Sequence, residues 1–175
     1  MMEAVDRVLV LVSGWVWGLP LLVLLMGTHL FLTVRLRFIQ RFIPRAIRLS
    51  FSRGAEGDGD VSHFGALAVA LAATVGTGNI VGVATAVSIG GPGAVLWMWL
   101  TGVFGIATKY AEAVLSVKYR VVNANGQMAG GPMYVLARGL GMPWLGFLFA
   151  LFTAVAAFGI GNMVQANAVT ALVHE

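Results

Sequence analysis

The sequence contains no cysteine and few charged residues. Without cysteine, the chain can form neither disulfide bonds nor thiolate metal sites. Charged residues make up 10% of the 175 residues, whereas hydrophobic residues make up 59%. A soluble domain carries about 25% charged residues, so this composition indicates a membrane protein. The sequence also lacks a Ser-His-Asp set, a metal-ligand cluster and a phosphate-binding loop. We therefore expect neither an enzyme active site nor a cofactor.

The basic residues are concentrated in one part of the chain. Six of the eleven Lys and Arg residues lie between Arg35 and Arg53, directly after the first apolar run. Such a cluster is typical of a cytoplasmic loop, and it argues against nucleic acid as a partner. Within it, residues 36–49 combine arginines at spacings of three or four with Phe and Ile. This pattern predicts a helix at the inner interface against anionic lipid, interrupted or restarted at Pro44. A flexible acidic loop is expected at 54–60.

Four apolar runs are long enough to cross a bilayer, which needs about 20 apolar residues. They lie at about 8–34, 64–89, 94–117 and 144–172. The sequence thus predicts an all-α, multi-pass protein of the cell membrane with about four transmembrane helices. The positive-inside rule places the N-terminus outside and the loops 35–63 and 118–143 in the cytoplasm.

Several local signals refine this outline. Ser62 is the expected N-cap of the second span, and the glycines and proline at 90–93 predict a tight outer turn. A short helix is expected at 133–138 inside the second cytoplasmic loop. His29 is expected to be an interfacial or packing residue.

A charged pair lies in the third apolar run. Lys109 and Glu112 are three residues apart, so a helix places them within pairing distance. Ion pairs inside a membrane are functional candidates. Because these two lie towards the inner half of the span, a structural ion pair is the favoured interpretation.

The second apolar run has a weak centre, Gly76-Thr77-Gly78-Asn79. Glycine is about 1 kcal/mol less favourable than alanine in a helix, and the other two residues add side-chain oxygens at mid-bilayer depth. If the helix breaks here, its first half ends in free carbonyl groups and its second half begins with free N–H groups. A cation site and a carboxylate site would then lie side by side.

The groups for each ligand follow from the chain direction. The N–H groups near Gly76, Thr77 and Gly78 could hold a substrate carboxylate. The oxygens available to a hard cation such as Na⁺ are the backbone carbonyls of Ala72, Thr74 and Val75 and the side-chain oxygen of Asn79.

Two polar or small-residue patterns leave alternatives open. Gly78 and Gly82 form a GxxxG pair, which marks close helix packing as often as a binding site, and spacing does not decide between them. Asn162 and Gln165 share one face of the fourth span. Their amides require either a neighbouring helix or a hydrated site as partner.

Six motifs follow one another between residues 74 and 167. They are residues 74–85 (TVGTGNIVGVAT), 90–94 (GGPGA), 97–99 (WMW), 109–113 (KYAEA), 130–134 (GGPMY) and 161–167 (GNMVQAN). Together they resemble the alanine or glycine:cation symporter family, also called sodium:alanine symporters. The resemblance extends from about residue 62 to the end of the chain.

The resemblance implies a fold of two inverted five-helix repeats, each with a broken first helix, and sodium-coupled import of alanine or glycine. It places the unwound centre at 76–79. It also implies that the Ala72 and Val75 carbonyls are ligands of one sodium site. Thr74 and Asn79 would be ligands of a second sodium site or of the substrate carboxylate. Gln165 would be an amide that lines the substrate site. Whether the substrate is alanine or glycine, and whether the coupling ion is Na⁺ or H⁺, stays open.

Family members continue well beyond residue 175. We therefore expect residues 1–63 to form a first helix with its basic loop, and residues 64–175 to form the first part of the symporter core, truncated before the second repeat. The missing C-terminal part would be a necessary partner, and the chain alone would not transport. The alternative is a non-transporting membrane fragment or structural subunit.

Overall fold

The computed structural model describes residues 2–52 and 60–174. Apart from Asp60, the acidic loop expected at 54–60 lies outside the described residues. In chain order the elements are α1 (Met2–Val16), α2 (Leu19–Arg35), the 3-10 helix η1 (Ile39–Phe42), α3 (Ile43–Ser50), α4 (His63–Thr74), α5 (Thr77–Gly90), α6 (Gly93–Lys118), β1 (Val121–Val122), β2 (Met128–Ala129), α7 (Pro132–Tyr134), the π-helix η2 (Val135–Gly139), α8 (Pro143–Ala156), the π-helix η3 (Ala157–Met163) and α9 (Val164–His174).

Long apolar helices dominate the described part of the chain. By length and composition, the helices spanning Val5–Arg35 and Pro143–Ala171 could each cross a membrane. Taken together, α4 and α5 are also long and apolar enough to cross a membrane, although the pair is bent by 51° at the break between them. This architecture is consistent with an all-α membrane protein.

In the described part of the chain, two helices, or three if the bent pair counts as one, are long and apolar enough to cross a membrane. About four spans were predicted, and the helix at the third predicted span is not among them. This helix, α6, forms without a break over 26 residues and is therefore about 39 Å long. It is long enough to cross a membrane, but its mean hydropathy is too low for it to count among the apolar spans. The charged residues Lys109, Glu112 and Lys118 and the less apolar tryptophans lower its hydropathy.

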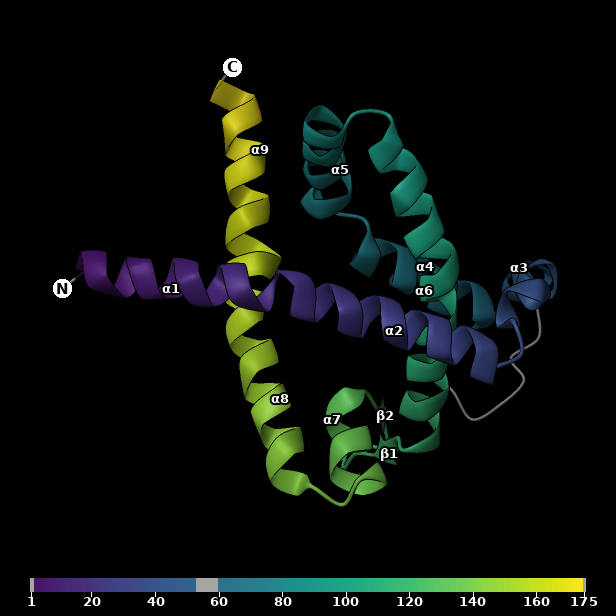
Figure 1. The fold of residues 1–175 in the computed structure, drawn as a ribbon. Helices are drawn as coiled ribbons and strands as arrows, with labels where there is room; N and C mark the ends of the chain where they lie inside the picture. The colour runs from purple at the N-terminus through teal and green to yellow at the C-terminus, as the bar shows by residue number, and fades with distance from the viewer. Residues whose placement is uncertain (1, 53–59, 175) are drawn as a thin grey trace.

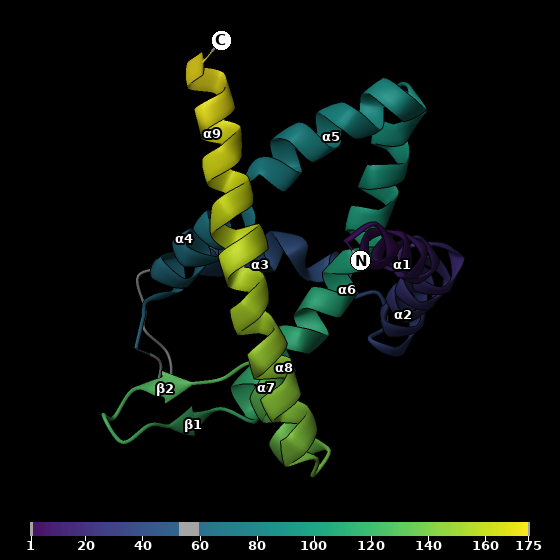
Figure 2. The ribbon, with the colours of Figure 1, turned by 90° about the vertical axis from the view of Figure 1, so that its left-hand side faces the viewer.

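The helices form two crossing rods and a hairpin (Figure 1). α1 and α2 make one long rod that lies across the others, and α8, η3 and α9 make the second rod. α5 and α6 form the hairpin, and α5 packs beside α9. The turned view shows α1 and α2 nearly end-on beside α6 and apart from the second rod, with the β1–β2 hairpin projecting to one side of α7 (Figure 2).

The most buried side chains lie where α2 crosses α6. His29 is 7% exposed and Thr33 is 2% exposed on α2, while Ala107 on α6 is fully buried. His29 Nδ1 and Thr108 Oγ1 are 2.6 Å apart and share a hydrogen bond. The packing role expected of His29 is therefore confirmed.

Two expected helix boundaries are confirmed. The Ser62 side chain caps α4 by accepting a hydrogen bond from the Gly65 N–H at 3.1 Å. The turn between α5 and α6 occurs at Gly91, whose φ of +65° is open to glycine and rare for other residues. The antiparallel α5–α6 hairpin follows from this turn.

The helix expected at 36–49 is shorter than predicted. Arg37 and Phe38 have φ values of +54° and +59°, so the chain turns sharply at the end of α2. A 3-10 helix follows, and α3 begins only at Ile43 with Pro44 in its first turn. Proline is tolerated in a first turn because the N–H it lacks would have no partner there.

The loop expected at 118–143 contains more structure than the short helix predicted in it. β1 and β2 pair antiparallel, with Val121 opposite Ala129 and Val122 opposite Met128. The Asp60 carboxylate accepts a hydrogen bond from the Met128 N–H at 3.0 Å and so joins the hairpin to the start of the α4 region. The predicted helix is present as α7 and η2.

Candidate functional site

The helix break lies in the second apolar run, as expected, but it is shorter than predicted. α4 ends at Thr74 and α5 begins at Thr77, so only Val75 and Gly76 lie outside the helices. The prediction that 76–79 forms the unwound centre is therefore too broad, because Thr77, Gly78 and Asn79 form the first turn of α5. Val75 and Gly76 both have extended backbone, which separates the two helices and allows the 51° bend.

The end of α4 supplies the carbonyl groups that the cation prediction requires. The last bond of this helix runs from the Val75 N–H to the Leu71 carbonyl at 2.9 Å. Beyond it, within the described chain, no backbone N–H bonds to the carbonyl of Ala72 or Thr74 across the break. The Thr74 hydroxyl donates to the Ala70 carbonyl at 2.7 Å, which leaves its own oxygen able to accept or coordinate. The negative end of the α4 dipole points at the same place.

The start of α5 supplies N–H groups. The Asn79 N–H donates to the Gly76 carbonyl at 3.0 Å, so it closes the first turn of the helix. The Thr77 N–H instead donates to the side-chain oxygen Oε1 of Gln165 on α9, at 3.2 Å. An amide oxygen therefore occupies one of the N–H groups predicted to hold a carboxylate.

Gly76 lies close enough to α9 that no larger residue fits without a shift. A Cβ atom at Gly76 would lie 2.8 Å from Gln165 Nε2, well inside van der Waals contact. The glycine and the glutamine therefore face one another across the break. The structure brings together three of the five predicted substrate-binding residues, Gly76, Thr77 and Gln165, and it leaves Gly78 and Asn79 exposed beside them.

The backbone before Gln165 departs from the α-helix. η3 is a π-helix over Ala157–Met163, and α9 resumes at Val164, one residue before Gln165. Asn162 lies inside η3 and is exposed, whereas Gln165 is half-buried. The shared face expected for these two residues is thus interrupted, and the interhelical hydrogen bond is made by Gln165. Short π-helical segments occur frequently at functional sites.

The GxxxG alternative finds no contact in the described structure. A Cβ atom at Gly78 or at Gly82 would meet no atom within 4 Å of it. Close packing against another described helix is therefore not what these glycines do here.

The charged pair of α6 forms as predicted. Lys109 Nζ lies 2.9 Å from Glu112 Oε2, with side-chain exposures of 80% and 45%. Both residues lie away from the helix break, on the helix that packs against α2. The geometry agrees with a structural ion pair.

The sequence analysis did not identify Gln40 as a contact residue. Gln40 in η1 donates from Nε2 to the Thr33 hydroxyl at 3.1 Å and to the Val103 carbonyl at 3.0 Å. It thereby fixes the turn after α2 against α6. A single amide among arginines and aromatic residues is the only hint that the sequence offers.

Comparisons with known proteins agree with the resemblance drawn from the motifs. A family model described as the sodium:alanine symporter family matches residues 2–175. A sodium/alanine symporter, AgcS, from Methanococcus maripaludis is 60% identical over 165 residues, which cover 90% of this chain and 36% of that protein. An uncharacterized transporter from Haemophilus influenzae is also 60% identical, over 95% of this chain and 37% of its own length.

A more distant relative carries a different substrate in its name. A probable sodium/glutamine symporter, GlnT, from Bacillus subtilis is 35% identical over 97% of this chain and 36% of its own length. The chain thus spans a little over a third of the length of the curated relatives it matches.

Proposed function

Since the chain belongs to the sodium:alanine symporter family, we propose that it forms part of a sodium-coupled importer of a small neutral amino acid, alanine or glycine, in the cell membrane. Sodium is the coupling ion in this proposal, and the protein is a carrier rather than an enzyme. The sodium/alanine and sodium/glutamine symporters among its relatives support a cation-coupled carrier.

The sodium ion is assigned to the C-terminal end of α4. The ligands proposed are the carbonyl oxygens of Ala72, Thr74 and Val75 together with the Asn79 side-chain oxygen. Hard cations prefer such oxygen ligands, and the negative end of the helix dipole adds to the attraction. The break supports this assignment, because an uninterrupted helix would use the same carbonyls for its own hydrogen bonds.

The substrate carboxylate is assigned to the N-terminal end of α5, at Gly76, Thr77, Gly78 and Asn79. The observation that carries this proposal is the hydrogen bond from the Thr77 N–H to Gln165 Oε1. The neutral amide oxygen satisfies an N–H group that would otherwise be unpaired in an apolar surrounding.

Substrate binding then exchanges one acceptor for another. A carboxylate is a stronger acceptor than an amide oxygen, so it replaces Gln165 at the Thr77 N–H. Gln165 is released to turn its NH₂ group towards the carboxylate, with which it makes a second hydrogen bond. In this proposal Gln165 serves first as an acceptor for the end of α5 and then as a donor to the substrate.

The remaining helices of the carrier complete the site in this proposal. Residues 1–63 act as a first span with its cytoplasmic loop, and residues 64–175 as the first part of a core of two inverted five-helix repeats. The N-terminus lies outside, and loops 35–63 and 118–143 lie in the cytoplasm. The hydrogen bond between Asp60 and the Met128 N–H supports placing these two loops on one side of the membrane.

Uptake of labelled alanine tests this function. Membrane vesicles carrying the full reading frame that contains these residues should accumulate alanine when Na⁺ is present outside, and should lose uptake when K⁺ replaces it. Asn79→Ala should lower uptake about tenfold, because a lost ligand to a charged group is worth about 1.5–3 kcal/mol. Asn123→Ala in the β1–β2 hairpin is the matched control and should leave uptake unchanged.

Two results would contradict the proposal. Uptake that persists without Na⁺ would show that Na⁺ is not the coupling ion. Equal uptake in the Asn79→Ala and Asn123→Ala variants would show that the Asn79 side chain is not a ligand in the site.

A further inference from the structure

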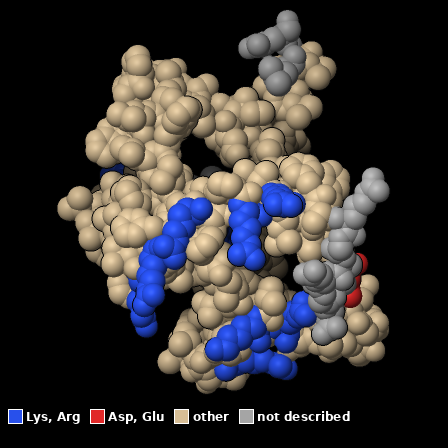
Figure 3. Space-filling model, turned by 90° about the vertical axis from the view of Figure 1, so that its right-hand side faces the viewer, with Lys and Arg blue, Asp and Glu red and all other residues tan. Residues whose placement is uncertain are grey.

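A second candidate site lies on the basic segment after α2. Five arginines occur between residues 35 and 48, and no acidic residue occurs between Asp6 and Glu56. Within the described chain, the ion pair found is that of Lys109 with Glu112, so these arginines have no carboxylate partner among the described residues. Figure 3 shows Lys and Arg side chains spread over this face of the molecule, with little acidic surface among the side chains coloured.

The backbone presents two of these arginines together. The turn at Arg37 and Phe38 redirects the chain, and α3 then runs over Ile43–Ser50. Arg45 and Arg48 are three residues apart on this helix, which places their Cβ atoms about 5–6 Å apart on one face. Both side chains are exposed, so their guanidinium groups are free to approach one ligand.

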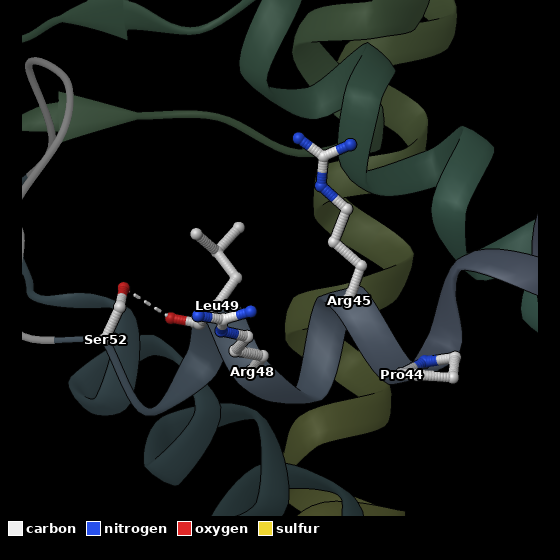
Figure 4. A pocket seen from close by; sticks show the side chains of 5 residues that line it. All are labelled: Pro44, Arg45, Arg48, Leu49 and Ser52. Carbon is white, nitrogen blue, oxygen red and sulfur yellow. Dashed lines mark hydrogen bonds between the residues drawn. The ribbon is translucent and has the colours of Figure 1, made fainter.

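The two guanidinium groups border an open pocket of about 560 Å³. Its lining residues are Pro44, Arg45, Arg48, Leu49 and Ser52, which Figure 4 draws as sticks. The Ser52 hydroxyl donates to the Leu49 carbonyl at 2.7 Å and lies 3.1 Å from His63 Nδ1, so it is already engaged. The polar groups left for a ligand are therefore the arginine N–H donors.

Those donors fix the chemistry of the ligand. A guanidinium group offers five N–H donors and no acceptor, in a planar arrangement that matches phosphate. Two such groups on one helix face favour an anion with several acceptor oxygens. A phosphate group fits this requirement.

The exposed apolar residues of the same segment distinguish a lipid from a soluble phosphate. Phe42, Ile47 and Phe51 are 42%, 56% and 64% exposed, and they belong to the same short stretch as the arginines. A soluble anion would leave these side chains in water, whereas a phospholipid brings acyl chains into which they can insert. An arginine-rich segment directly after an apolar helix is also the arrangement that anionic lipid attracts.

We propose that Arg45 and Arg48 hold the phosphate of an anionic phospholipid headgroup in the α3 pocket, which Leu49 also lines, while the exposed Phe42, Ile47 and Phe51 of the same segment insert among the surrounding acyl chains. The site anchors α3 in the plane of the membrane interface and thereby fixes the turn that follows α2. It is separate from the helix break and does not depend on the transport function.

Lipid titration of the purified chain tests the site. The chain in a neutral detergent is titrated with phosphatidylglycerol or with phosphatidylcholine, and bound lipid is counted by native mass spectrometry. Each arginine near an anionic headgroup contributes about a five-fold change in affinity. Phosphatidylglycerol should therefore bind about 25-fold more tightly than phosphatidylcholine, and the double variant R45Q/R48Q should abolish that preference.

Matched variants separate the pocket from general surface charge. K118Q/R138Q removes the same charge from the other basic loop and should leave the preference intact. Glutamine is a good helix former, so α3 should persist in R45Q/R48Q, which circular dichroism checks. The single variants R45Q and R48Q should each lose about five-fold, and they provide the test if the double variant loses helicity.

Three results would overturn the proposal. Equal affinity for the two lipids would show that the pocket does not select an anionic headgroup. An equal loss of the preference in K118Q/R138Q would show that the preference comes from overall positive charge and not from the α3 pocket. Displacement of phosphatidylglycerol by millimolar inorganic phosphate would assign the pocket to a soluble anion.

Discussion

The side-chain oxygen of Gln165 accepts a hydrogen bond from the backbone N–H of Thr77 at 3.2 Å, between residues 88 positions apart in the chain. This bond joins the start of α5 to α9 at the point where the α4–α5 span is broken. It makes the helix break a contact between two spans rather than a local irregularity of one.

Gln165→Leu should damage both the contact and transport. The leucine is similar in size but has no acceptor, so the Thr77 N–H loses its partner at a cost of about 1 kcal/mol. We expect lower stability of the chain in detergent and at least a tenfold lower Na⁺-dependent alanine uptake by the full reading frame. The matched control is Gln127→Leu, in the exposed β1–β2 hairpin. Uptake within twofold of the parent in both variants would remove Gln165 from the binding site.

Gly76→Ala should displace Gln165 without changing its chemistry. The new Cβ would lie 2.8 Å from Gln165 Nε2, so the flexible amide must move away and its bond to Thr77 must lengthen. Gly82→Ala is the control, because a Cβ there meets no atom within 4 Å. Alanine uptake should fall in the first variant only. A larger loss in the Gly82→Ala variant would favour a packing role for the GxxxG pair over the break.

His29→Ala should destabilise the crossing of α2 and α6. It removes a side chain that is 7% exposed and leaves the Thr108 hydroxyl without its partner at 2.6 Å. The expected loss is about 1–3 kcal/mol, measured by unfolding of the chain in detergent with denaturant. Thr28→Val serves as control, because the Thr28 hydroxyl is exposed and bonds to the Leu24 carbonyl of its own helix. Equal stabilities of the two variants would show that His29 is not a packing residue.

Asp60→Ala should loosen the β1–β2 hairpin. The Asp60 carboxylate accepts from the Met128 N–H at 3.0 Å, and that amide has no helix to protect it. A hydrogen bond worth about 1 kcal/mol corresponds to about five-fold faster amide exchange at Met128, which hydrogen-exchange mass spectrometry measures. Asp6→Ala, in α1, should leave exchange at this position unchanged. Exchange that is the same in both variants would argue against contact between the two loops.

Local features of the fold followed from local sequence. Ser62 caps its helix because a hydroxyl at that position can accept from the N–H three residues later. Gly91 turns the chain because a positive φ there has no steric cost. The two glycines near the centre of the second span allowed either a break or close helix packing; the family resemblance favoured the break, and its extent was overestimated.

Other features had no signal within reach of local rules. Arg37 and Phe38 adopt positive φ values that non-glycine residues rarely take, so no pattern announces this turn. The two π-helical segments use residues that are equally suited to an α-helix. The meeting of Gln165 with the break depends on packing between distant spans, and its prediction came from the family resemblance rather than from the residues themselves.

The π-helix η3 makes the position of Gln165 depend on the local backbone. A π-helix has more residues per turn than an α-helix, so the residues Ala157–Met163 rotate the chain less than the same residues would in an α-helix. If they became α-helical with none removed, α9 would turn relative to α8, and Gln165 would leave the side of the rod that faces Thr77. A substitution in η3 changes one side chain, but a change of helix type there would re-aim every residue of α9 at once.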